Sequence, residues 1–210
     1  MSNAVQAVFV VDDDASFLRS IERLLRSCGY STESFTSASD FLARYPRGAA
    51  GCVLADLHMP GMNGLEFQVA LAQLANPPPV VFLTGQGNIP STVMAMRRGA
   101  EDFLAKTAPK EAVIDAIERA LARNERERQA RSSLQGQQTR LDQLTTRERQ
   151  VLLQVLKGRL NKQIAFDMGV NERSVKRHRT NLMRKLGVKL VAELVQFAVE
   201  SGMTNSEPPN

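Results

Sequence analysis

Hydrophobic and polar residues follow one another in short blocks along residues 1–121. Short apolar runs bounded by turn residues are typical of strands buried on both faces, and a half-buried strand alternates. Four such runs and one alternating segment predict strands at 7–11, 31–35, 52–55, 80–84 and 102–105. Apolar positions at helical spacing predict helices from Phe17 to a stop at Gly29, at 39–45, 64–74 and 90–98, and from Pro109 past Leu121. Five strand–helix repeats indicate a parallel sheet with helices on both faces.

One helix needs a more detailed expectation. In the segment 64–74 we expect Leu65, Val69 and Leu71 or Ala72 to share the buried side.

Helix signals of another kind fill the last third of the chain. The caps and stops, in order, are the capping box Thr145-Thr146-Arg147-Glu148, Gly158, Asn161, Gly169, Asn171 and Gly187. The positions expected to face inward are Val151, Leu152, Val155, Leu156, Ile164, Ala165, Met168, Val175, Leu182, Leu186, Leu190, Leu194, Phe197 and Ala198. A short helix, a tight turn with glycine and a longer helix make a helix-turn-helix pattern within an all-α, four-helix domain.

The segment between these two regions, residues 122–143, is polar and contains no proline. Glu/Arg spacing predicts a helical linker that extends the preceding helix and could break near Gly136. Its sparse apolar points are Leu121, Leu134, Leu141 and Leu144. Two interpretations stay open, a short coiled coil with a second copy and a solvated helix or flexible tether.

Charge divides the chain at the same places. Residues 1–121 carry 10 Lys/Arg and 13 Asp/Glu, residues 122–143 carry 5 and 3, and residues 144–210 carry 12 and 6. The basic last third indicates a polyanionic partner.

Cys28 and Cys52 stand apart from each other and from any pair of histidines, so we interpret both as reduced core thiols of a cytosolic protein. No apolar run reaches membrane-spanning length and no signal peptide is visible, so we expect no membrane partner.

Candidate chemistry gathers at the carboxyl ends of the predicted strands. Asp12 and Asp13 follow the first strand, Asp56 follows the third, Thr84 ends the fourth and Lys106 follows the fifth. These ends share one edge of a parallel sheet, where open α/β folds bind ligands. Clustered carboxylates repel one another unless a cation joins them, and three carboxylates with backbone and water oxygens suit Mg²⁺. A carboxylate left free can attack a phosphoryl group while a metal, a lysine and a hydroxyl neutralise its oxygens.

Residues 5–121 resemble the receiver domain of two-component response regulators. The resemblance rests on Val-Val-Asp-Asp, Asp-Leu-His-Met-Pro-Gly-Met-Asn-Gly, Leu-Thr-Gly and Phe-Leu-Ala-Lys, in that order. It implies a flavodoxin-like fold in which Asp56 accepts a phosphoryl group from a sensor histidine kinase. It also implies that Mg²⁺ is held by Asp12, Asp13, Asp56 and the backbone carbonyl of His58.

The same resemblance assigns roles to further residues. Thr84 and Lys106 would bind the phosphoryl oxygens, and Phe103 stands at the aromatic switch position of the family. In that family the switch remodels the face formed by the fourth helix and the fifth strand. We expect no role for the imidazole of His58, and we interpret Asp14 as the cap of the first helix.

One dipeptide departs from the pattern of the family. Receivers usually have Lys-Pro with a cis peptide, and here Lys106 precedes Thr107. A cis bond before a non-proline residue costs about 3–4 kcal/mol. We therefore expect either a trans bond with a rearranged loop or a strained cis bond.

Residues 144–200 resemble the four-helix DNA-binding domain of the LuxR/NarL class. The matching segments are Leu-Thr-Thr-Arg-Glu-Arg-Gln-Val-Leu, Asn-Lys-Gln-Ile-Ala, Ser-Val-Lys-Arg-His-Arg and Met-Arg-Lys-Leu-Gly-Val. The resemblance implies that bases are read by Lys176, Arg177 and Thr180. It implies that DNA phosphates are contacted by Asn161, Lys162, Ser174, His178 and Arg184. With the receiver in front, the whole chain resembles FixJ-type transcriptional regulators.

These observations predict three segments, a receiver domain at 5–121, a linker at 122–143 and a helix-turn-helix domain at 144–204. We expect a disordered end at Asn205–Asn210.

Three functions are compatible with the sequence. The first is a cytoplasmic transcription factor, not an enzyme, that pairs through 90–98 and 101–105 when phosphorylated and binds double-stranded DNA as a homodimer, with RNA polymerase as a further partner. The second is an aspartyl-phosphate phosphatase, because Asp12-Asp13-Asp14-Ala15-Ser16 loosely resembles the haloacid-dehalogenase motif. That function would give the basic residues of 144–210 no role. The third is an architectural DNA binder with a degenerate receiver, which predicts strong salt dependence and no response to a phosphodonor.

Overall fold

The computed structural model describes residues 7–46, 48–85 and 89–203. The expected disordered end at Asn205–Asn210 lies outside these residues. The described residues belong to two compact units, divided between Arg128 and Gln129. Each unit is described by itself.

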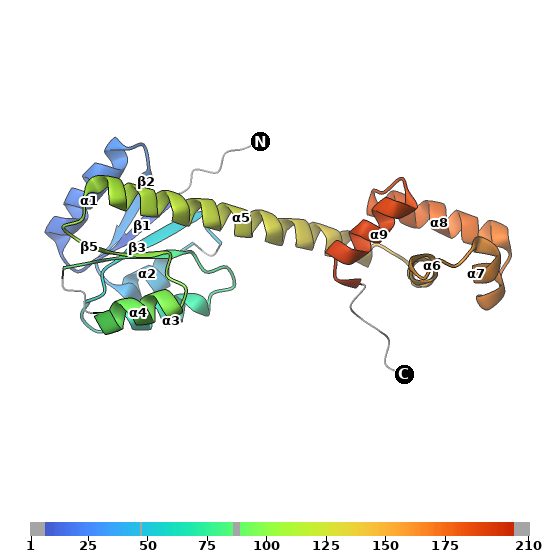
Figure 1. Ribbon diagram of the computed structural model, residues 1–210, viewed down its shortest axis with the longest axis horizontal. Coiled ribbons are helices and arrows are strands. Elements are labelled where there is room, and N and C mark those ends of the chain that lie inside the picture. Colours follow the sequence, from blue (N-terminus) through green and yellow to red (C-terminus); the bar gives the residue numbers. More distant parts are fainter. Residues whose placement is uncertain (1–6, 47, 86–88, 204–210) are drawn as a thin grey trace. The chain divides into compact units, whose positions relative to one another are not determined.

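The first unit contains a five-stranded parallel sheet (Figure 1). Its strands are β1 (Ala7–Val11), β2 (Ser31–Phe35), β3 (Gly51–Ala55), β4 (Val80–Thr84) and β5 (Asp102–Ala105). The strand order is β2-β1-β3-β4-β5. Val11 pairs with Ala55, Ala55 pairs with Phe82 and Thr84 pairs with Ala105, so the carboxyl ends of these strands lie at one edge, where β4 and β5 extend two residues further than β1 and β3. This arrangement confirms the predicted flavodoxin-like fold.

Helices cover both faces of the sheet. Residues that alternate along a strand point to opposite faces, and here both sets are apolar and need to be buried. The helices of this unit are α1 (Ala15–Ser27), α2 (Ala38–Arg44), α3 (Gly64–Ala72), α4 (Ile89–Arg97) and the part of α5 (Lys110–Asp142) that precedes Gln129. Phe9 and Phe82 point to the face covered by α2, α3 and α4, in a core rich in aromatic rings. Val8 and Leu83 point to the other face, where α1 and the first part of α5 cover them.

The buried side of α3 differs from the expectation. Phe67, Gln68 and Leu71 are buried, whereas Val69 is 47% exposed. The prediction was wrong for Val69 because the buried side of the helix was inferred from apolar residues alone. The polar Gln68 is buried, so the buried side does not coincide with the apolar positions. The Gln68 side chain donates a hydrogen bond to the carbonyl of Ala95 in α4, at 3.1 Å.

The two cysteines have different surroundings. Cys52 lies in β3, and burial raises the pKa of its thiol to about 12. Cys28 is exposed at the end of α1. The prediction of a core thiol was therefore wrong for Cys28, because the position after the last turn of an amphipathic helix faces solvent.

Helix α5 is one continuous helix of 33 residues that passes through Gly136 without a break. Its middle still belongs to the first unit. Asn124 is 3% exposed, and its side-chain oxygen accepts a hydrogen bond from the N–H of Gly51 at 3.1 Å. Arg128 donates to the carbonyl of Gly48 at 2.5 Å. The predicted helical extension is thus present, and the suggested break near Gly136 was wrong.

The second unit packs the end of α5 with four shorter helices. These are α6 (Thr146–Leu156), α7 (Asn161–Asp167), α8 (Glu172–Leu186) and α9 (Val191–Glu200). Its core contains Leu141, Leu144, Val151, Leu152, Val155, Ile164, Ala165, Val175, Leu182, Leu186, Leu194 and Phe197. Thr145 and Glu148 form the predicted capping box of α6, and Asn171 caps α8.

Two expectations about this unit were wrong. Asn161 is the first residue of α7 and not its cap, and its side-chain oxygen accepts a hydrogen bond from Arg179 at 3.0 Å. Leu190 is 62% exposed, because it is the residue that precedes α9 and extended backbone turns it outward. In both cases the helix begins one residue away from where the sequence pattern places it.

None of the helices within the described ranges has the length and apolar character needed to cross a membrane.

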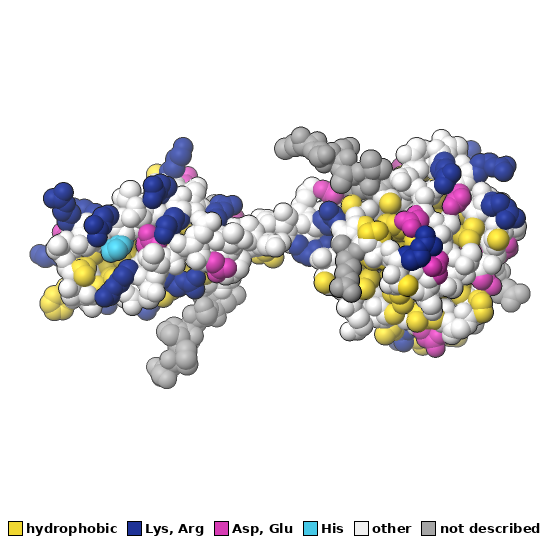
Figure 2. All heavy atoms as spheres, turned by 180° about the vertical axis from the view of Figure 1, so that it is seen from behind, with side chains coloured by type: hydrophobic (Ala, Val, Ile, Leu, Met, Phe, Trp, Pro, Cys, Tyr) yellow, Lys and Arg dark blue, Asp and Glu magenta, His cyan; other side chains and the backbone are white. Residues whose placement is uncertain are grey.

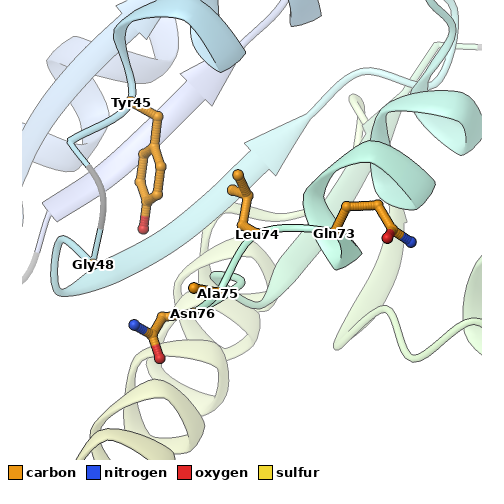
Figure 3. Close-up of a pocket in the computed structure, with 6 residues that line it drawn as sticks. All are labelled: Tyr45, Gly48, Gln73, Leu74, Ala75 and Asn76. Atoms are coloured by element: carbon orange, nitrogen blue, oxygen red, sulfur yellow. The ribbon is translucent and has the colours of Figure 1, made fainter.

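A pocket of about 320 Å³ opens in the first unit, between the turn after α2 and the end of α3 (Figure 3). Tyr45, Gly48 and residues 73–76 line it. These segments lead into the amino ends of β3 and β4, so the pocket lies at the sheet edge opposite Asp56.

Candidate functional site

Asp56 follows β3 directly and lies at the carboxyl edge of the sheet. Its N–H donates to the carbonyl of Val11 at 2.9 Å, which aligns it with the end of β1. The residue is 7% exposed. One carboxylate oxygen, Oδ2, accepts a hydrogen bond from Lys106 Nζ at 2.9 Å, and Oδ1 accepts one from the N–H of His58 at 3.3 Å.

Asp12 lies beside Asp56 at the end of β1 and is 1% exposed. Its Oδ2 is 2.6 Å from Lys106 Nζ, and its Oδ1 accepts a hydrogen bond from the N–H of Asp14 at 2.9 Å. Burial raises the pKa of Asp12, and the hydrogen bonds from Lys106 and Asp14 offset this effect only in part. Burial opposes the charge on Lys106, but its hydrogen bonds to the two carboxylates outweigh burial and raise its pKa. One ammonium group therefore bridges two buried carboxylates.

The peptide after Lys106 is trans, as is every peptide bond among the described residues. The loop is held by two main-chain hydrogen bonds, from the N–H of Lys106 to the carbonyl of Thr84 and from the N–H of Ala108 to the carbonyl of Ala105. Of the two alternatives that the sequence left open, the structure has the trans bond. The loop still brings Lys106 Nζ within hydrogen-bond distance of Asp12 and Asp56.

Three carboxylates converge on one point of this edge. Asp12, Asp13 and Asp56 each offer an oxygen, and these oxygens lie within 4.8 Å of one another. Asp13 is exposed, so the cluster opens to solvent on one side. Asp14 is turned away, and its Oδ1 caps α1 by accepting hydrogen bonds from the N–H groups of Ser16 and Phe17. Carboxylate oxygens with an open side are a donor set that fits Mg²⁺, which keeps several waters.

Thr84 ends β4 on the neighbouring side of Asp56. It is 2% exposed, and its Oγ1 lies 3.3 Å from Nδ1 of the exposed His58 ring. The sequence suggested no role for this imidazole, and no sequence signal could have revealed the contact, because it depends on how the loop after β3 orients the ring. Phe103 in β5 is half-buried and packs against Phe82, with ring centroids 6.1 Å apart.

Gly64, the last residue of the motif that begins at Asp56, lets the loop after Asp56 fold back. A Cβ at Gly64 would lie 2.6 Å from the carbonyl oxygen of Asp56 and 2.8 Å from Cα of Leu57. The start of α3 therefore packs directly on the backbone that carries Asp56. Asn63 and Glu66 form a capping box at this helix start, which fixes the loop from the other side.

Basic side chains mark a second candidate surface, on α8 in the other unit. Figure 2 shows Lys and Arg side chains gathered over one face of this unit. Lys176, Arg177 and Thr180, the predicted base readers, are exposed. Lys176 forms an exposed ion pair with Glu172 at 3.0 Å. The Thr180 hydroxyl donates to the carbonyl of Lys176 at 3.0 Å.

The predicted phosphate contacts are less uniform. Lys162 and Arg184 are exposed, whereas Ser174 and His178 are half-buried. Asn161 is also half-buried, and its side-chain oxygen is occupied by the hydrogen bond from Arg179. The Asn161 side chain therefore holds α7 to α8 and has only its amide N–H₂ left to donate to a ligand.

Polar contacts hold α8 against α6 and the end of α5. Lys185 Nζ is 2.6 Å from the buried Glu148 carboxylate and 3.0 Å from the carbonyl of Gln143. Burial raises the pKa of Glu148, but hydrogen bonds from Lys185 and Thr145 outweigh burial and lower it. Arg140 donates to the carbonyl of Leu186 at 3.0 Å. The sequence motif marks Glu148 as a cap, but it does not reveal that Lys185 is its partner.

Family models match both units. The family described as "Response regulator receiver domain" matches residues 8–118, and the family described as "Bacterial regulatory proteins, luxR family" matches residues 142–198. The chain belongs to the response regulators that join a receiver domain to a LuxR-type DNA-binding domain. The members of this family that it matches are transcriptional regulators and not phosphatases.

Particular relatives cover nearly the whole chain. Response regulator protein TodT of Pseudomonas putida F1 is 39% identical over 93% of this chain and 86% of its own length. Transcriptional regulatory protein FixJ of Rhizobium meliloti is 36% identical over 93% of this chain and 96% of its own. The solved structure of response regulator StyR is 43% identical, covers 94% of this chain and all of its own, and has a TM-score of 0.89.

Proposed function

We propose that Asp56 is the phosphoacceptor of this regulator and that a sensor histidine kinase is the donor. Transfer breaks the bond between phosphorus and the histidine nitrogen of the kinase and forms a bond to a carboxylate oxygen of Asp56. The observation that carries the proposal is the lysine ammonium of Lys106, which contacts both Asp56 and the buried carboxylate of Asp12, while Thr84 ends the strand next to β3.

The acidic cluster supports a role for Mg²⁺. Asp12, Asp13 and Asp56, with the backbone carbonyl of His58, would hold the ion. When bound, Mg²⁺ supplies positive charge for the phosphoryl oxygens. Lys106 already contacts Asp56 and would neutralise one phosphoryl oxygen, and the hydroxyl of Thr84 would donate to another.

The phosphoryl group would change the surface of the receiver through Thr84 and Phe103. Thr84 pairs with Ala105 in β5, the strand that contains Phe103. Movement of the Thr84 side chain toward the phosphoryl group would leave space beside β5. The half-buried Phe103 ring could then turn inward to fill it. The face made by α4 and β5 would then pair with a second copy. Exposed apolar residues on α4 support this step, since Val93, Met94 and Met96 are each 43–44% exposed.

Pairing of receivers would bring two DNA-binding units to one operator. Two recognition helices can then occupy half-sites about one helical turn apart, which raises affinity through effective concentration. Lys176, Arg177 and Thr180 would read bases. Phosphate contacts would come from Asn161, Lys162, Ser174, His178 and Arg184. RNA polymerase is the expected further partner of a DNA-bound regulator, and the cytoplasm is where the protein would meet DNA.

The test measures phosphorylation and self-association in the same samples. Full-length protein is incubated with acetyl phosphate and Mg²⁺, and intact mass and sedimentation are recorded for wild type, Asp56→Asn and Asp40→Asn. Asp40→Asn is the matched control, because it removes a carboxylate from the surface of α2. We expect wild type and the control to gain one phosphoryl group and to form dimers, and Asp56→Asn to do neither.

Two results would contradict the proposal. The first is phosphorylation that persists in Asp56→Asn. The second is a wild type that stays unmodified while an ordinary receiver is modified in the same buffer. A DNA affinity that does not respond to the phosphodonor would instead favour the architectural DNA binder with a degenerate receiver.

A further inference from the structure

His58 contacts both the carboxylate of Asp56 and the hydroxyl of Thr84. Its main-chain N–H donates to Asp56 Oδ1 at 3.3 Å, and its ring Nδ1 lies 3.3 Å from Thr84 Oγ1. The ring comes from the loop after β3 and reaches the end of the neighbouring strand β4. His58 thus joins the candidate phosphoacceptor to the hydroxyl that would respond to it.

Thr84 can change only its side-chain orientation without disturbing the sheet. Its main-chain carbonyl accepts a hydrogen bond from the N–H of Lys106 at 2.8 Å, and its backbone pairs with Ala105. The residue is 2% exposed, and a buried hydroxyl proton needs an acceptor. Neutral Nδ1 is such an acceptor when the ring proton is on Nε2, and the exposed ring leaves Nε2 to water.

A threonine hydroxyl has only one proton to donate. If that proton is donated to His58 Nδ1, it cannot also be donated to a phosphoryl oxygen on Asp56. We propose that the His58 imidazole is a positioning residue that holds the Thr84 hydroxyl in its resting orientation and so opposes activation. This inference rests on the proposed function, in which Asp56 carries the phosphoryl group and Thr84 binds it.

The proposal predicts an equilibrium effect that a phosphoryl mimic can measure. Beryllofluoride with Mg²⁺ is titrated into full-length protein, and the bound fraction is followed by fluorine NMR. Loss of one neutral hydrogen bond that holds the resting state should tighten binding about three- to tenfold. We expect this change for His58→Ala and also for His58→Phe, which keeps a ring of similar size without nitrogen.

Two further variants separate the hydrogen bond from other effects of the ring. His58→Asn keeps a polar atom near the position of Nδ1, so its affinity should stay close to that of wild type. In a Thr84→Ala background, His58→Ala should no longer change the affinity, because the partner hydroxyl is absent. All these variants keep the main-chain N–H that contacts Asp56.

Several outcomes would overturn the inference. They are a wild-type affinity in His58→Phe, a weaker affinity in His58→Ala, and an effect of His58→Ala that persists without the Thr84 hydroxyl. Failure of the proposed function looks different. In that case wild type neither binds beryllofluoride nor gains a phosphoryl group from acetyl phosphate, and both ideas fall together.

Discussion

At the carboxyl end of β1, one lysine neutralises two carboxylates that would otherwise repel each other. Lys106 Nζ is 2.6 Å from Asp12 and 2.9 Å from Asp56, and all three side chains are largely buried. A buried charge without a partner is costly, so this lysine has a structural role in the metal-free protein as well as a role in the proposed chemistry. Mg²⁺ would compete for the same negative charge.

Lys106→Met should therefore destabilise the receiver in metal-free buffer. We expect the free energy of unfolding to fall by about 1–3 kcal/mol, because two buried carboxylates lose their cation. Added Mg²⁺ should restore more stability in this variant than in wild type, since the metal replaces the missing charge. Urea unfolding of the receiver with EDTA and with Mg²⁺ measures both effects.

Lys110→Met is the matched control for this prediction. Lys110 forms an ion pair with Glu111 in which both side chains are about 70% exposed, so we expect a change below about 0.5 kcal/mol. An equal loss of stability in the two variants would show that Lys106 is not the required counter-ion.

Among the elements, α8 depends on a buried ion pair for its position. Lys185 near its end contacts Glu148 of α6, which is 4% exposed. Glu148→Gln should lower the free energy of unfolding of the second unit by about 1–3 kcal/mol at pH 7. The control is Glu172→Gln, which removes the exposed ion pair with Lys176 and should cost less than about 0.5 kcal/mol.

The same ion pair predicts a pH dependence with a definite sign. The pKa of Glu148 is lowered in the folded protein, so the folded state binds fewer protons than the unfolded state in the acid range. The stability from this pair is complete above the ordinary glutamate pKa of about 4.3 and is lost as pH falls through the lower, folded value. Glu148→Gln should therefore flatten the decline of stability below pH 5, as followed by urea unfolding. An unchanged acid profile would contradict this assignment.

The exposed face of α8 predicts two different effects on DNA binding. Lys176→Ala should cost about 1–3 kcal/mol on a specific operator and relax the preference for one base pair, because a base contact carries sequence information. Arg184→Ala should weaken specific and nonspecific DNA alike and lower the salt slope by about one, because a phosphate contact releases a counterion. Fluorescence anisotropy at several salt concentrations separates the two. Identical behaviour of the two variants would contradict the division into base and phosphate contacts.

At the scale of the whole molecule, the contacts of helix α5 differ from those expected for a linker at residues 122–143. The expected linker began at residue 122, but Asn124 and Arg128 belong to the first unit and form hydrogen bonds with Gly51 and Gly48. It was expected to end at residue 143, but Leu141 is 5% exposed in the core of the second unit. We propose that the true linker is a short stretch of α5 that includes Gly136.

Fragments of the chain test these boundaries. A fragment that begins at Gln129 keeps Leu141 and the hydrogen bond from Arg140 to Leu186, and a fragment that begins at Leu144 loses both. We expect the longer fragment to be more stable by about 2–5 kcal/mol, the usual cost of losing a buried leucine. Urea unfolding followed by circular dichroism measures the difference. A control that begins at Ser133 should match the longer fragment, and equal stability of all three would support the original boundary.

Local signals accounted for most of the predicted elements. Asp14, Thr145 and Asn171 each cap a helix as their sequence context indicates, because a capping side chain bonds to N–H groups two or three residues away. The predictions failed where a residue depends on packing from a distance. Val69 and Leu190 are apolar but exposed, because hydrophobicity does not by itself determine the phase or the first residue of a helix.

The sequence alone determined the order of the strands and helices along the chain and the division into two units. It also determined that Asp12, Asp56, Thr84 and Lys106 gather at one sheet edge. These follow from apolar periodicity and from the rule that parallel strands end on the same side. Tertiary structure alone decided that Lys106 reaches both carboxylates through a trans peptide and that the His58 ring meets Thr84. Such contacts join residues from different strands and loops, and their distances depend on sheet register and loop packing, which no short stretch of sequence encodes.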